Sequence, residues 1–339
     1  MKPAKFHTVV EVPAFNRKTG YSVKNIFMGS CFTENVGNRM AALKYNVDIN
    51  PFGILYNPVA VANGLRILLH QKEFTATDLI QADGLWHSFS HHGQFSFQNQ
   101  KQTLEEINNR IISSSEFLKE AGFLFITFGT AWIYKYKKTG QPVSNCHKIP
   151  AKEFDRVRLT VTEIVAEYKQ LFAEIRKINP SLKIVFTVSP IRHWKDGAVE
   201  NQRSKAILML AIDELIHEFG DEFCAYFPAY EIVMDELRDY RFYAEDMIHI
   251  SDVAVDYIWE KFEESLIDKE SQQIASQVKK VIQATGHKPL YKNTDEFLSF
   301  LKQMEKKIIS LESKYEHLNF TVEKEYFKTE KNKIELRLR

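Results

Sequence analysis

Short apolar runs alternate along this chain with longer segments in which apolar residues recur every three or four positions. A short apolar run bounded by Gly, Pro, Asn or Ser is typical of a buried strand, and a longer periodic segment is typical of an amphipathic helix. The strand-like runs lie at residues 25–30, 45–50, 122–129, 181–190 and 223–228. The helix-like segments lie at residues 33–44, 59–70, 103–119, 160–179, 199–219 and 251–267. This alternation predicts an α/β fold around a mainly parallel sheet of about five strands.

Two of the predicted helices begin with a capping-box signature, in which Ser or Thr is followed three residues later by Glu or Gln. The first runs from Thr103 to Glu106 and the second from Thr160 to Glu163. We therefore expect helices to start at both positions.

Residues 72–102 break the alternation, because they mix aromatic residues with Gly and His in a strand-like pattern. A pattern of this kind between two predicted helices indicates an insertion in the α/β framework. We expect a small β-ribbon there, or a lid over a pocket.

In the C-terminal part of the chain, the spacing of apolar residues differs from the alternation described above. Apolar residues alternate spacings of four and three at Phe297, Leu301, Met304, Ile308, Leu311, Tyr315 and Leu318. This is a heptad seam of about three repeats. It predicts either an amphipathic helix packed on its own chain or a homodimer through residues 294–318. We accordingly divide the chain into a domain at residues 1–268 and a helical extension at residues 269–339.

Composition narrows the class of protein. The chain has 339 residues, of which 44% are apolar and 26% charged, and a formal net charge of +1. This near neutrality gives no electrostatic basis for binding nucleic acid or an anionic membrane. The three cysteines are too few for a disulfide framework or a Cys-rich zinc site. Since no signal-peptide-like run or long apolar stretch is present, we expect a cytoplasmic protein.

Polar residues follow each predicted strand, where an open parallel sheet binds its ligands. The strand ends carry residues 29–31, 50–53 with Asn57, 129–132 and 189–193, and residues 246–249 precede the last helix. If the strands are parallel, all of these segments meet at one edge of the sheet. That edge then holds a serine, two histidines and an aspartate, which indicates a catalytic site.

The residue types at this edge suit nucleophilic catalysis. A serine such as Ser30 needs a nearby base, and a histidine such as His249 titrates near neutral pH. Asp246, three residues before His249, can orient the imidazole and stabilise its cation. A serine at a strand-to-helix turn also lies beside helix N-terminal amides that can hold an oxyanion.

These motifs resemble the GSCFA family of bacterial proteins. The resemblance covers roughly residues 5–268 and rests on GSCF at 29–32, NPFGILYNP at 50–58, SPIRH at 189–193 and DMIH at 246–249. That family is grouped with the SGNH/GDSL-type esterases and acyl hydrolases. The resemblance implies a three-layer, flavodoxin-like sandwich with strand order 2-1-3-4-5.

The same resemblance implies roles for individual residues. Ser30 is the nucleophile, and Asp246 and His249 complete the triad. The N–H groups of Ser30 and Gly53 bind the oxyanion. The family pattern also has an asparagine in a Gly-x-Asn-Asp block, but here the stretch from Gly129 reads GTAW. Asn57 or Thr130 is the expected replacement.

Several further residues are candidates for the pocket or its surroundings. Cys31 is expected to point into the core, and the alternative is a thiol nucleophile. His193 and His147 are expected to contact substrate, and His87 to lie near it beside an aromatic lid. Trp132 and Trp194 suit the core or a pocket wall.

We predict no metal site and no cofactor. His91 and His92 are adjacent, which points their side chains apart on extended chain, and no carboxylate or cysteine accompanies the WHSFSHH stretch at ligand spacing. Glycine-rich phosphate loops are also absent from the sequence.

The sequence thus predicts a serine hydrolase that cleaves an ester, with an O-acetyl or other short acyl group on a glycan or small molecule as substrate. One alternative is an acyltransferase that uses the same site. The other is a degenerate hydrolase that binds a glycan or a protein.

Overall fold

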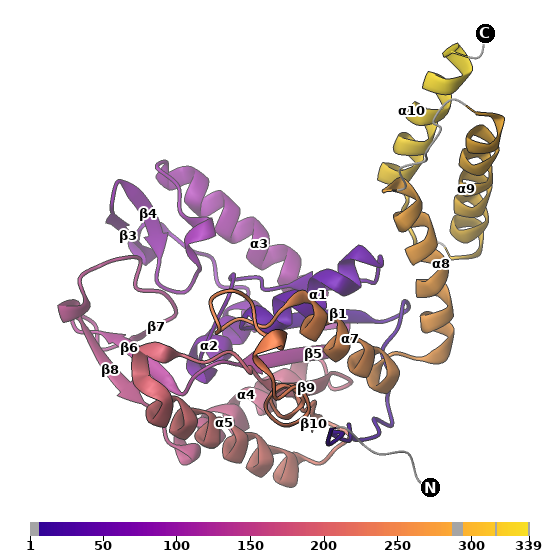
Figure 1. The fold of residues 1–339 in the computed structure, drawn as a ribbon. Helices are drawn as coiled ribbons and strands as arrows, with labels where there is room; N and C mark the ends of the chain where they lie inside the picture. The colour runs from indigo at the N-terminus through magenta and orange to yellow at the C-terminus, as the bar shows by residue number, and fades with distance from the viewer. Residues whose placement is uncertain (1–6, 287–293, 316, 338–339) are drawn as a thin grey trace, which may run out of the picture.

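The computed structural model of this protein describes residues 7–286, 294–315 and 317–337. Five parallel strands form the central sheet (Figure 1) in the order β2-β1-β5-β9-β10. Their bounds are β1 Lys24–Gly29, β2 Val47–Ile49, β5 Ala121–Phe128, β9 Lys183–Val188 and β10 Cys224–Tyr226. In sequence order this is 2-1-3-4-5, so the predicted topology is confirmed.

Helices cover both faces of the sheet and complete the three layers. Side chains of β1 alternate between the faces: Ile26 and Met28 join one buried cluster, and Phe27 joins the other. The first face is covered by α2 Pro58–Leu69, α3 Gln100–Glu120, α4 Val161–Ile178 and α5 Gly197–Phe219. The second face is covered by α1 Cys31–Ala42, α7 Asp252–Leu266 and the short α6 Ala229–Glu231.

One of the two predicted helix starts is confirmed and the other is wrong. Thr160 and Glu163 form the capping box of α4. Helix α3 instead begins at Gln100, where Asn99 caps it by accepting a hydrogen bond from the Gln102 N–H. Asparagine is among the strongest N-caps, so the helix gains three residues ahead of Thr103.

The insertion at residues 72–102 contains an antiparallel hairpin, as predicted. Its strands are β3 Leu79–Ala82 and β4 Leu85–Ser88, with 3-10 turns at Ala76–Asp78 and Gly93–Phe95. A second small sheet was not expected as such: β6 Trp132–Tyr136 lies between β7 Pro142–Val143 and β8 Phe154–Arg158. It follows β5 directly, so it adds aromatic and basic side chains to the edge where the polar residues gather.

After the short α6, the segment that leads to α7 consists of irregular turns. It contains a π-helix at Ile232–Glu236 and a 3-10 turn at Tyr240–Phe242. Two further 3-10 turns lie at Ala151–Glu153 and Trp194–Asp196. The turn at Trp194–Asp196 directly follows His193, and the irregular segment before α7 carries His249.

Three helices extend from the α/β part at one side (Figure 1): α8 Lys269–Thr285, α9 Asp295–Lys314 and α10 Thr321–Arg337. The seam residues Phe297, Leu301, Ile308 and Leu311 of α9 are buried in the chain itself, in one cluster with residues of α8 and α10. The interpretation of this seam as a helix packed on its own chain therefore describes the structure. The homodimer through residues 294–318 stays a prediction.

These helices are attached to the α/β part by polar and aromatic contacts. The Tyr21 ring lies 5.3 Å from the His317 ring between α9 and α10, and the Tyr21 N–H donates to Ser271 Oγ of α8 at 3.1 Å. Lys44 pairs with Glu323 of α10 at 3.0 Å. Among the described helices, none combines the length and apolarity needed to cross a membrane.

Candidate active site

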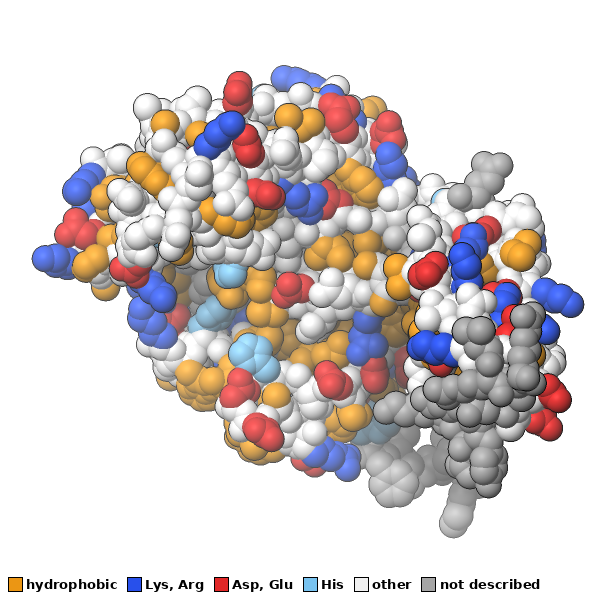
Figure 2. Space-filling model, turned by 90° about the horizontal axis from the view of Figure 1, so that it is seen from above, with side chains coloured by type: hydrophobic (Ala, Val, Ile, Leu, Met, Phe, Trp, Pro, Cys, Tyr) orange, Lys and Arg blue, Asp and Glu red, His pale blue; other side chains and the backbone are white. Residues whose placement is uncertain are grey.

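A pocket of about 360 Å³ opens at the carboxyl ends of the central strands. Its lining includes Ser30, Asn57, Thr130, His193 and His249, which the sequence had placed on one edge. Figure 2 shows a hollow in this face of the molecule, with histidine side chains in it and Lys and Arg side chains gathered at one end. With Cys31, the predicted alternative nucleophile, six of the predicted site residues therefore share one cavity.

Ser30 follows β1 and is the N-cap residue of α1. The preceding Gly29 has φ of +141°, and a Cβ there would lie 2.2 Å from the Thr127 carbonyl oxygen, so only glycine fits this turn. Ser30 is 2% exposed, and its Oγ has no hydrogen-bond partner among the described residues. A buried hydroxyl without a partner is unfavourable, and such groups concentrate where a protein acts on a ligand.

Asp246 and His249 form a preassembled pair. The His249 Nδ1–H donates to Asp246 Oδ2 at 2.5 Å, and the other carboxylate oxygen accepts from the N–H groups of Ile248 and His249, both at 2.9 Å. The hydrogen bond from His249 is the main cause that lowers the pKa of Asp246 to about 2. Asp246 thus stays ionised at neutral pH and holds the imidazole with Nε2 available for a second partner.

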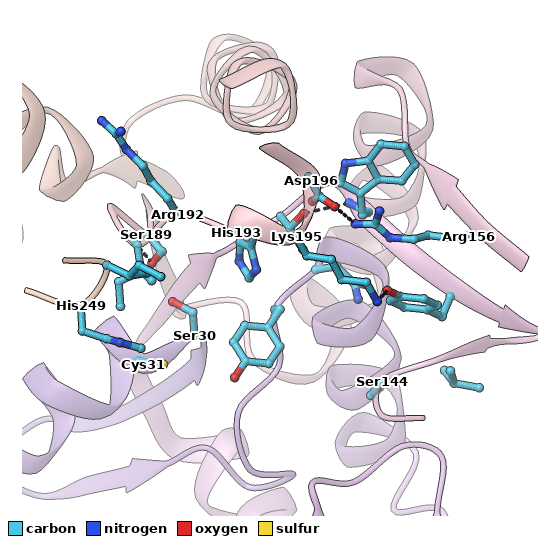
Figure 3. A pocket seen from close by; sticks show the side chains of 18 residues that line it. Ser30, Cys31, Ser144, Arg156, Ser189, Arg192, His193, Lys195, Asp196 and His249 are labelled. Carbon is cyan, nitrogen blue, oxygen red and sulfur yellow. Dashed lines mark hydrogen bonds and ion pairs between the residues drawn. The ribbon is translucent and has the colours of Figure 1, made fainter. Parts of the chain in front are cut away.

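Ser30 and His249 are not hydrogen-bonded to each other in this structure. Ser30 and His249 line the same pocket and are neighbours in Figure 3, but no hydrogen bond joins Ser30 Oγ to His249. The imidazole is 54% exposed on an irregular turn. Catalytic hydrogen bonds of this kind commonly tighten only when substrate is bound.

Cys31 lies in the pocket wall, so the prediction that it points into the core is wrong. It is the first residue of α1, and the helix turns its side chain toward the Tyr56 hydroxyl. Burial raises the pKa of the Cys31 thiol. Because the thiolate is the reactive form, this environment disfavours Cys31 as the nucleophile.

Two predicted backbone donors for the oxyanion already have partners. The Gly53 N–H donates to the Asn50 carbonyl at 2.7 Å inside a tight turn, and Gly53 lies outside the pocket. The Ser30 N–H donates to the Thr127 carbonyl at 3.2 Å. Gly53 is therefore a turn residue, with φ of +75°, and its prediction as an oxyanion donor is wrong.

Gly129 and Thr130 do not supply backbone donors either. Both of their N–H groups donate to the Tyr56 carbonyl, at 2.8 and 2.9 Å. The Thr130 hydroxyl lies 3.1 Å from Ser204 Oγ and accepts from the Trp132 N–H. These bonds join the end of β5 to neighbouring segments and shape the pocket floor.

Among the residues predicted to stabilise the oxyanion, Asn57 is the one whose side chain has a donor available in the pocket. It caps α2, where its Oδ1 accepts from the Ala60 N–H at 2.8 Å. The side chain is 7% exposed and lines the pocket. Because the oxygen faces the helix, the Nδ2 amide is the end left for a ligand.

His193 lines the pocket as predicted. Its ring packs edge-on against Tyr56, and a Cβ on Gly129 would approach its Nε2 to 3.3 Å. Burial, helped by the Lys205 charge, lowers the pKa of His193 to about 4. His193 is therefore neutral at physiological pH, which suits a hydrogen-bonding contact with substrate better than the role of general base.

Lys205, buried below the pocket, was missed in the sequence. Its ammonium donates to the carbonyls of Gly129 and Ser189, each at 2.6 Å, and so ties together the ends of β5 and β9. Burial lowers the pKa of Lys205 to about 7. The feature of the sequence that could have indicated it is a lysine on the apolar face of α5, three residues before the buried Leu208.

His147 and His87 lie outside the pocket, so their predictions as substrate contacts are wrong. The His147 Nε2–H donates to the Ser88 carbonyl at 2.7 Å, and its ring stacks on His87 at 4.4 Å. His87 in turn bonds Ser96 Oγ and the Ala82 carbonyl. His147 thus packs on the insertion from the loop after β7, where burial lowers the pKa of His147 to about 4.

The insertion is also not a lid in this structure, since no residue of 72–102 lines the pocket. It packs instead against the turn after β2, where the His92 N–H donates to the Phe52 carbonyl at 2.8 Å. His91 bonds Ser88 Oγ and lies among aromatic rings. In the described ranges, no group of three side chains is arranged to hold a metal ion.

The rest of the pocket wall comes from the small sheet β7-β6-β8 and the turn after β9. Trp132 lies in this wall, whereas Trp194 is 46% exposed and lies outside it. The Arg156 guanidinium lies 4.4 Å from the centre of the Trp132 ring and pairs with Asp196. Arg156 was not predicted as a site residue, because it becomes a neighbour of the pocket only when the small sheet forms.

The family model described as GSCFA family matches residues 24–262 of this chain. The chain belongs to the GSCFA family. A second model, described as GSCFA domain protein, C-terminal domain, matches residues 278–333, the region of α8, α9 and α10. No curated protein sequence matches this GSCFA chain.

Two solved structures resemble the fold. A carbohydrate esterase family 3 protein from Talaromyces cellulolyticus shares 9% identity over 77% of this chain and 99% of its own, with a TM-score of 0.34. An acetyl xylan esterase, Est2A, from Butyrivibrio proteoclasticus shares 10% identity over 75% of this chain and 66% of its own, with a TM-score of 0.35. Similarity at this level does not indicate what this chain does.

Proposed function

We propose that this chain is a serine hydrolase that cleaves a carboxylic ester. The observation that carries the proposal is the preassembled Asp246–His249 pair in one pocket with the buried, unpartnered hydroxyl of Ser30. A nucleophile, a base and a group that orients the base are the parts this reaction needs.

The proposed reaction begins when Ser30 Oγ attacks the ester carbonyl while His249 Nε2 takes the hydroxyl proton. The resulting oxyanion is stabilised by Asn57 Nδ2 and by the Cys31 N–H at the start of α1, which has no acceptor within the helix. His249 returns the proton to the leaving alcohol, and an acyl–Ser30 ester remains. Water, deprotonated by His249, then releases the acid and restores Ser30.

The proposed substrate is a small ester or the end of a glycan that carries an O-acetyl or other short acyl group. A pocket of about 360 Å³ lies in the range of small-molecule sites. Acyl transfer would use the same residues but needs water to be kept out. The half-exposed His249 and the absence of the insertion from the described pocket wall favour hydrolysis.

Labelling with a fluorophosphonate probe tests the proposal on the wild type and three variants, Ser30→Ala, His249→Ala and Cys31→Ala. We expect peptide mapping to find the probe on Ser30, and labelling to disappear in the first two variants and to persist in Cys31→Ala. Hydrolysis of para-nitrophenyl acetate should follow the same order. Undiminished labelling in Ser30→Ala would contradict the proposal.

A further inference from the structure

The pocket has a second polar end, away from Ser30 and His249. Lys195, Tyr134 and Ser144 line it, and each comes from a different segment: the turn after β9, strand β6 and the loop after β7. In Figure 3, Lys195 and Ser144 lie on the side of the pocket opposite His249, and the Lys195 ammonium donates to the Tyr134 hydroxyl. The cavity therefore continues from the triad to a cluster of hydrogen-bond donors.

The charges of the pocket lining are unbalanced. Among the described residues that line it, Arg156, Arg192 and Lys195 are cationic, and Asp196 is the only carboxylate. Asp196 pairs with Arg156. The chain as a whole carries a net charge of only +1, so this local excess is a property of the pocket.

Lys195 carries a charge that no carboxylate neutralises within the described chain. Its ammonium donates to the Tyr134 hydroxyl at 3.1 Å and lies 5.6 Å from the centre of that ring. This hydroxyl accepts from Lys195, so its own proton is available for another partner. Lys195 is an exposed residue whose ammonium is held at the Tyr134 hydroxyl, where it can meet both water and a ligand.

Two donors thus meet at this end, the Lys195 ammonium and the Tyr134 hydroxyl, and Ser144 adds a hydroxyl group to the pocket lining. Ammonium and hydroxyl donors from separate segments suit a group with two or more anionic oxygens. Arg156, stacked on Trp132 and held by Asp196, adds a fixed cation behind them.

We propose that this end of the pocket binds an anionic group of the substrate, a carboxylate or a phosphate, while the ester carbonyl lies at Ser30. This inference rests on the proposed hydrolase function and names its substrate class: esters that carry a negative charge away from the scissile bond.

A pair of esters of equal chain length tests the inference. The para-nitrophenyl ester of pentanoic acid is neutral, and the mono-para-nitrophenyl ester of glutaric acid carries a carboxylate. We expect the wild type to have the higher kcat/KM on the glutarate ester. Lys195→Met should lower the ratio of the two kcat/KM values about tenfold, the usual effect of losing a charged hydrogen bond.

Lys152→Met is the matched control, because Lys152 is an exposed lysine outside the pocket. It should leave both kcat/KM values unchanged. Added salt should reduce the wild-type preference for the charged ester. Competition by glutarate or by inorganic phosphate, measured on the neutral ester, shows which anion the site prefers.

Failure of the inference differs from failure of the proposed function. A wild type that hydrolyses both esters equally, with a ratio unchanged in Lys195→Met, overturns the inference and leaves the hydrolase intact. If neither ester is hydrolysed, calorimetric titration with glutarate and with phosphate tests the anion site directly. Binding to the wild type that is weaker in Lys195→Met supports the site. No binding to the wild type overturns it.

Discussion

Ser30 occupies a position where serine ordinarily stabilises a helix. An N-cap serine usually accepts a hydrogen bond from an amide of the first turn, which contributes about 1 kcal/mol. Ser30 makes no such bond, and the Thr33 hydroxyl instead donates to the Ser30 carbonyl. The hydroxyl of Ser30 is thus kept free at the cost of the cap, which is expected of a nucleophile and not of a structural serine.

Replacing Ser30 by alanine distinguishes a nucleophilic serine from a structural one. Ser30→Ala should abolish ester hydrolysis and change the free energy of unfolding by less than about 1 kcal/mol, since the lost hydroxyl had no protein partner. Urea denaturation and the para-nitrophenyl acetate assay measure the two quantities. A loss of stability above about 2 kcal/mol would instead indicate a structural hydroxyl.

At the scale of elements, the site depends on how the ends of two neighbouring strands are held. Strands β5 and β9 end in carbonyls that point at Lys205 of α5, which is fully buried. Removing a lysine from water disfavours its charged form, which lowers the pKa of Lys205 to about 7. The unfolded chain holds this proton up to a pKa of about 10.4.

A pH dependence of stability follows from this difference. Between about pH 7 and pH 10 the unfolded state binds more protons at Lys205 than the folded state, so stability rises with pH in this window. Relative to Lys205→Met, which lacks the group, the wild type should gain on the order of a few kcal/mol across it. Urea midpoints of both proteins at several pH values measure the gain. Parallel curves for the two proteins would contradict the burial of a titrating ammonium.

For the whole molecule, the C-terminal helices and the α/β part share one hydrophobic cluster. Residues such as Phe125 and Phe262 of the α/β part belong to the same cluster as Leu301 and Phe327 of the extension. The seam of α9 is thus occupied by the chain's own helices, and its residues contribute to folding.

The corresponding prediction uses two positions of α9. Leu301 is completely buried, and Ile309 is 63% exposed. Leu301→Asp should lower the free energy of unfolding by more than about 3 kcal/mol, because it places a charge in the core. Ile309→Asp should change it by less than about 0.5 kcal/mol. Sedimentation measures oligomeric state in parallel: a dimer that Leu301→Asp converts to a folded monomer would show that the seam is an interface between copies.

Much of the fold was predictable from the chain itself. The strands and helices follow from local periodicity, and parallel connection through helices restricts the sheet to few orders. The Asp246–His249 pair was also predictable, because a spacing of three residues on one turn is a local feature.

Only the tertiary structure decided which groups of the site are available. Gly53 and Gly129 carry N–H groups that sequence reasoning could not distinguish from free donors, because their acceptors are the Asn50 carbonyl in a turn and the Tyr56 carbonyl on another segment. His147 likewise finds its partner 59 residues away, at the Ser88 carbonyl. Periodicity along a chain reports which face is buried, whereas the pairing of polar groups depends on contacts between distant segments, and those contacts exist only in the folded molecule.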